Sequence, residues 1–319
     1  MSLRAWSCFA AVSVLWGIPF LFIKLAVDDG VPPVFVAWAR LVIGAAILGV
    51  VAWRMGVLGG LRGRLRWVAA WGLTEMAIPF PLIASGEVHV SSSLTAILLA
   101  SAPLMVSVLA IRLDPAERAR GTRLVGLVIG LAGVVALVGV DVAGRSDELL
   151  GASAILLAAL CYAVGPFMLR GPLAGADATA VVTVAMLFAA LMLTPFVLTD
   201  LPSVTPSGTA IGSLVVLGVA CSAAAFVLYA ILVAEVGGSR AMVITYVAPV
   251  VAVALGVTVL GENLGAGAVA GLLLILAGSW LATGGRRPPG LGSALRVFGR
   301  ERRPTVRDVG EARVDPAAG

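Results

Sequence analysis

VGLVIGLAGVVALVG, residues 125–139, and AGLLLILAGSWLATG, residues 270–284, are two apolar segments of one chain that lie 145 residues apart. Six of their fifteen aligned positions are identical, and three of these are glycines. Neither segment contains a charged residue, and each has the length of about four helical turns. Two related apolar segments at this distance indicate an internal repeat.

The match continues toward the N-terminus at an offset of 146 residues. Residues of distinctive chemistry or shape coincide at this offset: Trp16 with Tyr162, Lys24 with Arg170, Gly72 with Gly218, and Pro103 with Pro249. Chance similarity explains many single matches among Leu, Ala, Val and Gly. It does not explain proline, basic and aromatic matches that share one offset, so the sequence predicts two related halves.

The composition places the chain in a membrane. Of 319 residues, 60% are hydrophobic and 12% are charged, and the mean hydropathy is +1.07. A soluble domain of this composition would expose too much apolar surface, and disordered, collagen-like or coiled-coil chains need more polar residues or a strict short repeat. A polytopic membrane protein remains.

The residues that common enzyme sites require are scarce. The three cysteines, Cys8, Cys161 and Cys221, have no C-x-x-C spacing, and an odd number cannot form a closed set of disulfides. His89 is the only histidine, and no cluster of His, Cys and carboxylate residues or glycine-rich phosphate loop is present. We therefore expect no metal, no cofactor and no enzymatic activity.

The hydrophobic segments fit the thickness of a bilayer. A helix needs about 20 apolar residues to cross about 30 Å of hydrocarbon. Ten segments approach this length: Ala5–Val27, Val34–Trp53, Trp67–Gly86, Ser92–Ile111, Leu124–Val140, Leu149–Leu169, Ala178–Thr199, Ala210–Ala234, Ala241–Leu260 and Leu264–Thr283. The predicted fold is an all-α integral membrane protein with ten transmembrane helices.

The distribution of arginines predicts the orientation. With the N-terminus inside, cytoplasmic segments hold 19 of the 22 Lys and Arg residues, whereas the outer loops hold only Arg145. Basic residues stay in the cytoplasm, so both termini are predicted there. Residues 1–27 also resemble a signal peptide, but the apolar run is long and no A-x-A site follows it. The net charge of +5 reflects this bias, and no nucleic-acid partner is expected.

The predicted domains follow from the repeat. Residues 1–142 and 149–284 form two five-helix halves, and residues 285–319 form a disordered cytoplasmic tail. Because five is an odd number, the second half must enter the membrane in the opposite sense to the first. Inverted repeats are the architecture by which many secondary transporters alternate access to a site near the midplane.

Several motifs resemble a known family. The run from Gly238 through TYVAPVVAVALGVTVLGENLGAGAVAGLLLILAG, residues 245–278, is similar to the second-half signature of EamA-type members of the drug/metabolite transporter superfamily. Trp16-Gly17 with Lys24, Pro33, Phe35 and Arg40 are similar to its first two helices, and residues 77–98, with Gly86-Glu87-Val88-His89, resemble one branch. DPAER at residues 114–118 departs from an expected sequence closer to LGER.

The resemblance covers about residues 5–284. Most members of this family export or take up small metabolites, so the resemblance implies a transporter without choosing its substrate.

Charged residues within predicted spans are candidates for function because a charge near the bilayer centre costs about 2.5 to 3.5 kcal/mol on insertion scales. Arg40 and Glu75 are predicted to face a central, water-filled cavity and to pair there. Glu75 is the candidate proton carrier, because a buried carboxyl group whose surroundings change can bind and release a proton. A static structural ion pair is the alternative interpretation.

Further polar and aromatic residues could line the same cavity. Flat aromatic faces or hydroxyl groups are offered by Trp16, Trp71, Tyr162, Ser222, Tyr229, Thr245 and Tyr246. Ser and Thr usually satisfy their own helix instead. The candidates for a rim or gate are Lys24, Glu87, His89 and Arg170. Lys24 can equally extend to outer headgroups and pair with Asp28 or Glu87.

Prolines and glycines predict where the helices bend and pack. The candidate hinges are Pro19, Pro79, Pro81, Pro103, Pro166 and Pro249, for which a simple kink is the alternative. Gly126, Gly130 and Gly133, with Gly271 and Gly278, allow close approach of the fifth and tenth helices. Packing within one chain is the default, and a homodimer through this face is the alternative.

Taken together, the sequence predicts a secondary transporter of a small organic metabolite or drug-like solute. We expect alternating access, export and proton coupling. The alternatives are an integral-membrane enzyme acting on lipid-linked substrates, and a receptor or scaffold without transport. Among the 22 Lys and Arg residues there is one lysine, which suggests GC-rich coding and a bacterial cytoplasmic membrane.

Overall fold

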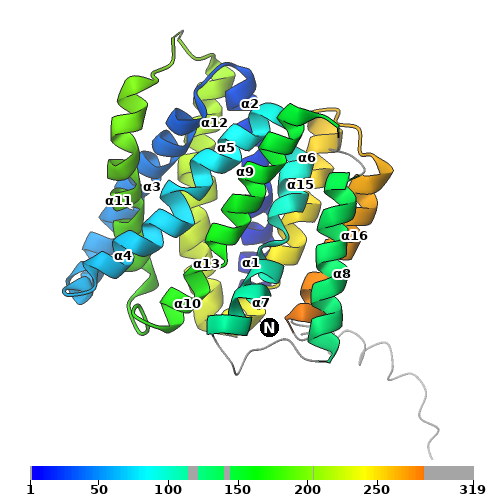
Figure 1. The fold of residues 1–319 in the computed structure, drawn as a ribbon. Helices are drawn as coiled ribbons and strands as arrows, with labels where there is room; N and C mark the ends of the chain where they lie inside the picture. Colours follow the sequence, from blue (N-terminus) through cyan, green and yellow to red (C-terminus); the bar gives the residue numbers. More distant parts are fainter. Residues whose placement is uncertain (1, 114–120, 140–143, 204, 284–319) are drawn as a thin grey trace, which may run out of the picture. The chain divides into compact units, whose positions relative to one another are not determined.

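The computed structural model describes residues 2–113, 121–139, 144–203 and 205–283 (Figure 1). The described residues form helices and no strands. The DPAER segment and the predicted tail lie outside the described residues.

Seven helices are long and apolar enough to cross a membrane: Leu3–Asp28, Pro33–Met55, Leu65–His89, Ser92–Arg112, Ser146–Arg170, Ala178–Thr199 and Gly208–Val236. Three shorter apolar helices, of 16 or 17 residues, cover Thr122–Leu137, Ile244–Val259 and Ala266–Ala282. An all-helical membrane fold is therefore confirmed, and the number of ten spans stays a prediction.

The first half of the chain contains the elements up to α8 (Figure 1). Their bounds are α1 Leu3–Gly17, α2 Pro19–Asp28, α3 Pro33–Met55, the 3-10 helix η1 Val57–Leu61, α4 Leu65–Gly72, the π-helix η2 Leu73–Ala77, α5 Pro79–His89, α6 Ser92–Leu99, α7 Ala102–Leu113 and α8 Thr122–Leu137.

The second half contains the elements from α9 onward (Figure 1). Their bounds are α9 Ser146–Tyr162, α10 Gly165–Arg170, α11 Ala178–Thr199, α12 Gly208–Gly218, the π-helix η5 Val219–Ala224, α13 Ala225–Val236, α14 Gly238–Ala241, α15 Ile244–Val259 and α16 Ala266–Ala282.

Irregularities of the helices repeat at the offset found in the sequence. The π-helices η2 and η5 begin at Leu73 and Val219, which are 146 residues apart. The helices that follow the breaks in the first and sixth predicted spans begin at Pro19 and Gly165, again 146 residues apart. The two halves therefore share local backbone structure as well as sequence.

Corresponding helices of the two halves run in opposite directions (Figure 1). In this view α3 descends and α11 rises, whereas α8 rises and α16 descends. The matched helices also pack against each other, α3 on α11 and α8 on α16. Other helices also pack across the two halves: α5 packs on α9, α2 packs on α12, and α1 packs on α13.

The predicted contact between the glycine-rich helices forms within the chain. A Cβ atom added to Gly126 would lie 2.8 Å from the carbonyl oxygen of Gly278, and one added to Gly278 would lie 2.7 Å from that of Gly126. Gly133 and Gly271 face each other in the same way. These glycines therefore pack α8 against α16 within one chain, as the default interpretation predicted. A homodimer stays a prediction.

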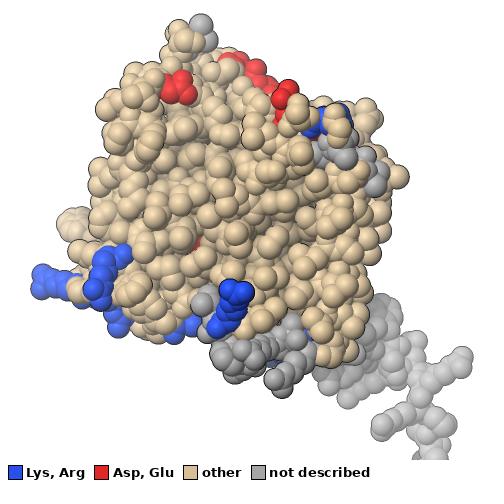
Figure 2. Space-filling view, in the orientation of Figure 1, with Lys and Arg blue, Asp and Glu red and all other residues tan. Residues whose placement is uncertain are grey.

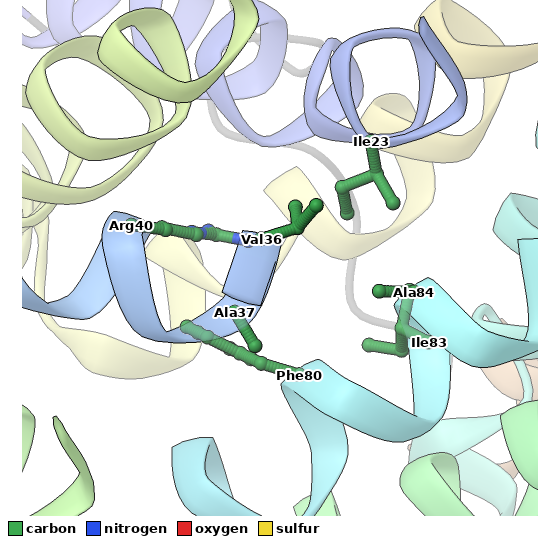
Figure 3. Close-up of a pocket in the computed structure, with 7 residues that line it drawn as sticks. All are labelled: Ile23, Val36, Ala37, Arg40, Phe80, Ile83 and Ala84. Atoms are coloured by element: carbon green, nitrogen blue, oxygen red, sulfur yellow. The ribbon is translucent and has the colours of Figure 1, made fainter. Parts of the chain in front are cut away.

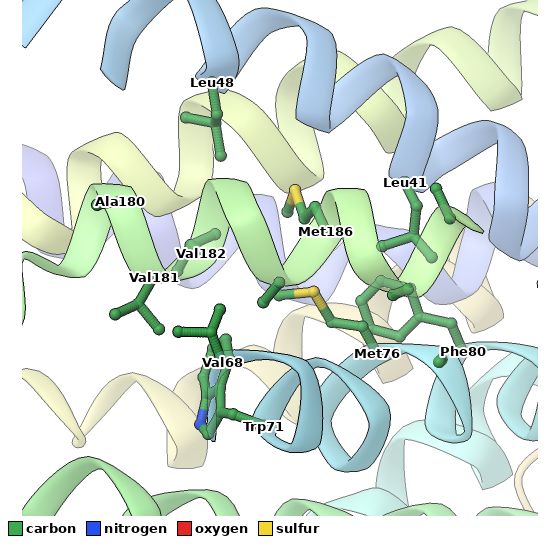
Figure 4. Close-up of a cluster of buried hydrophobic side chains, with 14 of the residues drawn as sticks. Leu41, Leu48, Val68, Trp71, Met76, Phe80, Ala180, Val181, Val182 and Met186 are labelled. Carbon is green, nitrogen blue, oxygen red and sulfur yellow. The ribbon is translucent and has the colours of Figure 1, made fainter. Parts of the chain in front are cut away.

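An apolar core joins the two halves around α11 (Figure 4). Leu41 and Leu48 of α3 and Val68 of α4 are almost fully buried with Met186 of α11. Trp38 of α3 adds a hydrogen bond from its indole nitrogen to the hydroxyl of Thr194, at 3.1 Å. This core holds α3 and α4 in place, and the candidate site lies beside it.

Charges separate toward the two ends of the helices (Figure 2). Lys and Arg gather mainly along the lower edge, where α1 begins and α3 ends, and Asp and Glu gather along the upper edge. This separation is the pattern expected for cytoplasmic and outer faces. We name the two ends after the predicted orientation: below, the upper edge is the outer end and the lower edge is the inner end.

Candidate functional site

Arg40 is held between the two halves of the protein. It lies on α3 and is 9% exposed. Its Nε donates a hydrogen bond to the Ser222 hydroxyl at 2.8 Å, and that hydroxyl donates to the carbonyl oxygen of Leu217 at 2.9 Å. The guanidinium carbon also lies 4.2 Å from the ring centroid of Phe80, a cation–π contact. A first-half cation is therefore bound by a second-half hydroxyl.

The π-helix η5 explains why the Ser222 hydroxyl can accept a hydrogen bond from Arg40. The wider turn directs the Ser222 hydroxyl to the carbonyl oxygen five residues earlier, rather than three or four residues earlier. Its oxygen can still accept the hydrogen bond from Arg40. Ser222 thus satisfies its own helix and Arg40 together, although the sequence offered these as separate interpretations.

Glu75 lies in the other π-helix, η2, at the same level of the repeat. Its Oε1 is buried without a hydrogen-bond partner among the described residues, as is the indole nitrogen of Trp71. Both atoms lie against Gly165, where a Cβ atom would overlap the carboxyl group and would lie 3.1 Å from the Trp71 nitrogen. Glycine is required here because the carboxyl group occupies the space of a side chain.

Tyr162 is a neighbour of both charged residues. It is close enough to interact electrostatically with both Arg40 and Glu75, and it belongs to the last turn of α9. Arg40 contacts Ser222 and Phe80 and forms no ion pair with Glu75 in the described part of the chain, so the predicted pairing of Arg40 with Glu75 is wrong. Arg40 is turned toward η5, whereas Glu75 is turned toward the break between α9 and α10.

A small cavity lies beside Arg40 (Figure 3). Apart from Arg40 it is lined by the apolar side chains of Ile23, Val36, Ala37, Phe80, Ile83 and Ala84. It has room for about one water molecule. The open, water-filled pocket predicted at Arg40 is therefore not present in this conformation, in which the core of α2, α3 and α5 closes around the guanidinium group.

A larger groove lies on the side of the molecule. It has a volume of about 380 Å³ and is lined by Val34, Leu73, Ala77, Ile78, Pro81, Leu82, Met192, Leu193 and Phe196. All of these side chains are apolar, and the elements that supply them belong to candidate membrane spans. The groove offers no polar side chain that could select a solute, so the polar cluster of Arg40, Tyr162, Glu75 and Ser222 is the candidate site.

The other predicted cavity residues lie elsewhere. Trp16 packs against Tyr229, with ring centroids 4.8 Å apart, and against Phe226. The Tyr246 hydroxyl lies 2.8 Å from that of Thr283 on α16. Thr245 donates to the carbonyl oxygen of Met242 at 2.7 Å, which is the local bonding expected of a helical threonine. The sequence placed these residues with Arg40 because depth alone does not give the direction of a side chain.

The predicted hinge prolines occupy three kinds of position. Pro19, Pro79, Pro103 and Pro166 lie at the first or second residue of a helix, where the missing amide hydrogen is tolerated. Pro81 follows in the first turn of α5, and Pro249 lies inside α15. Pro19, Pro79, Pro103 and Pro166 thus stand at breaks within candidate spans, and their role as hinges stays a prediction.

The predicted gate residues divide between the two ends. Lys24 on α2 donates to Asp28 Oδ1 and to the backbone carbonyl oxygen of Glu87, each at 2.9 Å. The predicted pair with Asp28 is thus confirmed. Glu87 is fully buried, His89 is exposed, and both end α5 at the outer end. Arg170 ends α10 at the inner end.

Glu262, at the outer end, caps the N-terminus of α6, a role that was not predicted from the sequence. Its carboxylate accepts hydrogen bonds from the backbone nitrogens of Ser92 and Ser93, at 2.7 and 3.0 Å, and from the Ser93 hydroxyl at 2.5 Å. A carboxylate at the N-terminus of α6 also complements the helix dipole. The signal was the three serines before an apolar run, which indicate a helix start, but they do not reveal a cap from 170 residues away.

Comparisons with known proteins agree with this architecture. The EamA-like transporter family matches the chain twice, over residues 4–139 and 149–284. A solved structure titled "Crystal structure of protein" superposes with a TM-score of 0.62 at 24% identity, covering 88% of this chain and 97% of that one. The structural likeness shows a shared fold.

Relatives of similar length carry transporter names. An "Uncharacterized transporter" of Archaeoglobus fulgidus is 26% identical, over 88% of this chain and 98% of that protein. The "Uncharacterized inner membrane transporter YedA" of Escherichia coli strain K12 is 31% identical, over 80% and 82%. A "Probable terminal-alkyne amino-acid exporter" of Streptantibioticus cattleyicolor is 29% identical, over 82% and 87%.

The two family matches span nearly all the described helices, and the relatives agree with the apolar helices in placing the chain in the plasma membrane as a multi-pass protein. The protein is a membrane transporter, and it belongs to the EamA-like transporter family.

Proposed function

We propose that this transporter is a secondary exporter of a small organic solute that works by alternating access and proton exchange. The observation that carries the proposal is the position of the polar cluster. Arg40 contacts Ser222 in the π-helix η5, and Glu75 contacts Gly165 at the break between α9 and α10. Both of these first-half residues therefore contact an irregular segment of the second half. A relative movement of the halves would change the surroundings of both charges.

The opposite directions of matched helices support alternating access. In an inverted repeat, each half can adopt the conformation that the other half has just left, which closes one side of the site while the other opens. We propose ten spans, with both termini in the cytoplasm, because the shorter helices α8, α15 and α16 pack among the long ones and the basic residues gather at the inner end. The closed site described above would then be an occluded state.

The buried carboxyl group of Glu75 supports proton exchange. A buried carboxylate oxygen without a hydrogen-bond donor is costly, so Glu75 should hold a proton while the site is closed. When the break at Gly165 moves, Glu75 would gain water or a solute group as a partner and release its proton. No ATP is needed in this scheme, because the proton gradient supplies the driving force.

The chemistry of the cluster suggests which solutes to test first. Arg40 can bind a carboxylate, Glu75 can bind an amine, and Tyr162 and Trp71 offer aromatic faces. A zwitterionic amino acid with an apolar side chain has matching groups. One relative is named an amino-acid exporter, which is a further reason to begin with this class.

The experiment is solute flux into proteoliposomes that contain the full chain. A panel of amino acids is first screened by thermal shift, and radiolabelled hits are then assayed with and without a pH gradient. We expect accumulation that needs the gradient in wild type and fails in E75Q. E148Q is the matched control, because Glu148 pairs with Arg145 at the exposed start of α9. Absence of flux for every solute that binds would favour a receptor, and chemical conversion of the solute would favour an enzyme.

A further inference from the structure

Glu87 is a second buried carboxylic acid, and it lies far from Glu75 along α5, at the outer end. Its side chain is 0% exposed, and neither carboxyl oxygen has a hydrogen-bond partner among the described residues. A carboxylate that loses water without gaining a donor is strongly disfavoured. The geometry of this conformation therefore fits a neutral, protonated acid.

The nearest cation is turned away from the Glu87 carboxyl group. Lys24 of α2 donates to Asp28 and to the backbone oxygen of Glu87, but not to its side chain. Had Glu87 been ionised, its carboxylate would have been a stronger acceptor for the lysine than the backbone carbonyl oxygen. Lys24 is nevertheless within reach, because its ammonium group already contacts residue 87.

The other charged neighbours are acidic and engaged. Glu87 interacts electrostatically with Asp28 and with Glu262 as well as Lys24. Glu262 accepts three hydrogen bonds from the start of α6. On α9, which packs against α5, Asp147 and Glu148 lie in the exposed first turn, and His89 of α5 itself is exposed. A carboxylate at Glu87 would meet two nearby negative charges and one cation.

We infer that Glu87 is a proton-binding site at the outer end and that Lys24 changes partner when this proton leaves. With the proton bound, Lys24 ties α2 to the backbone of α5 and to Asp28. On release, the proton passes to water on the outer side, and Lys24 turns from Asp28 to the Glu87 carboxylate. The inference goes beyond the proposed role of Glu75 and does not depend on the identity of the solute.

The capping contact of Glu262 would connect this site to the conformational change that opens the outer end. Glu262 belongs to the loop between α15 and α16, whereas Ser92 and Ser93 belong to α6 in the other half. Separation of the halves at the outer end would break this cap and admit water beside Glu87. Outward opening and proton release would therefore accompany each other.

Infrared spectroscopy of the purified full chain in lipid tests the inference without a solute. A protonated, buried carboxyl group has a carbonyl stretching band that an ionised one lacks. We expect the band of wild type at pH 7 to contain a component that is lost in E87Q and retained in E262Q, the control for a neighbouring carboxylate. The component of Glu75, which is proposed to be protonated as well, should remain in E87Q. E75Q reports on Glu75 separately, so failure of the proposed coupling role would be distinguished. An unchanged carboxyl band in E87Q would overturn the inference.

Two further variants complete the test. If E87Q does not yield folded protein, E87D should keep the acid and shift its band, and an unshifted band would contradict the inference. In K24Q the band should persist to higher pH than in wild type, because the cation that would stabilise the carboxylate is removed. An identical titration in K24Q and wild type would refute the exchange of partners by Lys24.

Discussion

Glu75 and Arg40 differ from ordinary buried charges in that each has a contact with the opposite half of the chain. Glu75 lies against the backbone of Gly165, and Arg40 donates to Ser222. A charge held within one rigid unit stays in the same surroundings throughout a cycle. A charge held between two units experiences a change when they move, which is what coupling to a proton or a solute requires.

The first prediction concerns Glu75. E75Q keeps the shape and removes the titratable group, so we expect it to bind solute and to exchange it across the membrane without a gradient. Uphill accumulation driven by a pH gradient should be abolished. Counterflow and gradient-driven uptake are measured in the same proteoliposomes, with E148Q as control. Full gradient-driven accumulation in E75Q would remove Glu75 from the coupling mechanism.

The second prediction concerns the cap on α6. E262A removes an acceptor of three hydrogen bonds, and loss of such a cap costs about 1 to 2 kcal/mol. The free energy of unfolding, measured by denaturant titration in mixed micelles, should fall by this amount. E262Q retains one acceptor oxygen and should lose less. E148A, at a partly exposed position in a surface ion pair, should change stability little. Equal stability of E262A and wild type would contradict the capping role.

Sequence analysis was informative about the depth of polar residues and less so about their direction. Hydropathy identified Arg40 and Glu75 as lying within apolar helices. Arg40 is buried, and Glu75 is partly buried with its Oε1 enclosed. It predicted that they pair, because it assumed regular helices. The π-helices η2 and η5 change which way the following side chains point, and no composition or spacing in the sequence announces a π-helix.

At the scale of helices, comparison of the two equivalent π-helices, η2 and η5, shows that proline does not cause the wide turn. Pro79 follows η2, but the corresponding residue after η5 is Ala225. What the two sites share is close packing before the wide turn. Gly72 lies against Ala185 of α11, and Gly218 lies against Ile43 of α3. The repeat therefore preserves the contact between halves, and a single proline accompanies only one copy.

The third prediction concerns the packing of α8 on α16. A methyl group at Gly278 would lie 2.7 Å from the carbonyl oxygen of Gly126 and closer still to the backbone of Gly130, which cannot move aside as a side chain could. We expect G278A to lower the free energy of unfolding by about 1 to 3 kcal/mol. G212A is the matched control, because no atom lies within 4 Å of a Cβ atom placed there. If both variants unfold alike, the close contact is not required.

The sequence predicted this pair of helices well for a physical reason. Glycine at spacings of three and four residues leaves a flat strip on one helix face, and its repetition in the other half supplies the matching strip. The sequence could not decide between contact within a chain and contact between chains, since both use the same strip. The structure places the strip inside one chain.

At the scale of the whole molecule, the fourth prediction concerns topology. Because matched helices run in opposite directions, Ser203 and Ser146 should lie outside the cell, and Gly60 and Ala176 should lie inside. Single cysteines at these positions, in a chain without native cysteines, are treated with a membrane-impermeant maleimide on intact cells. We expect labelling of the first two only, and labelling of all four after permeabilisation. Labelling of Gly60→Cys in intact cells would contradict the inverted arrangement.

The native Cys161 gives the most direct test of alternating access. It lies in the last turn of α9, is partly exposed and interacts electrostatically with Glu75, so it reports on the site itself. In a chain whose only cysteine is Cys161, within sealed and oriented vesicles, we measure its modification by impermeant reagents added to one side at a time. The account predicts that either side can modify it, with opposite preferences when the pH gradient is reversed. Modification from one side only under every gradient, or equal modification from both sides whatever the gradient, would contradict it.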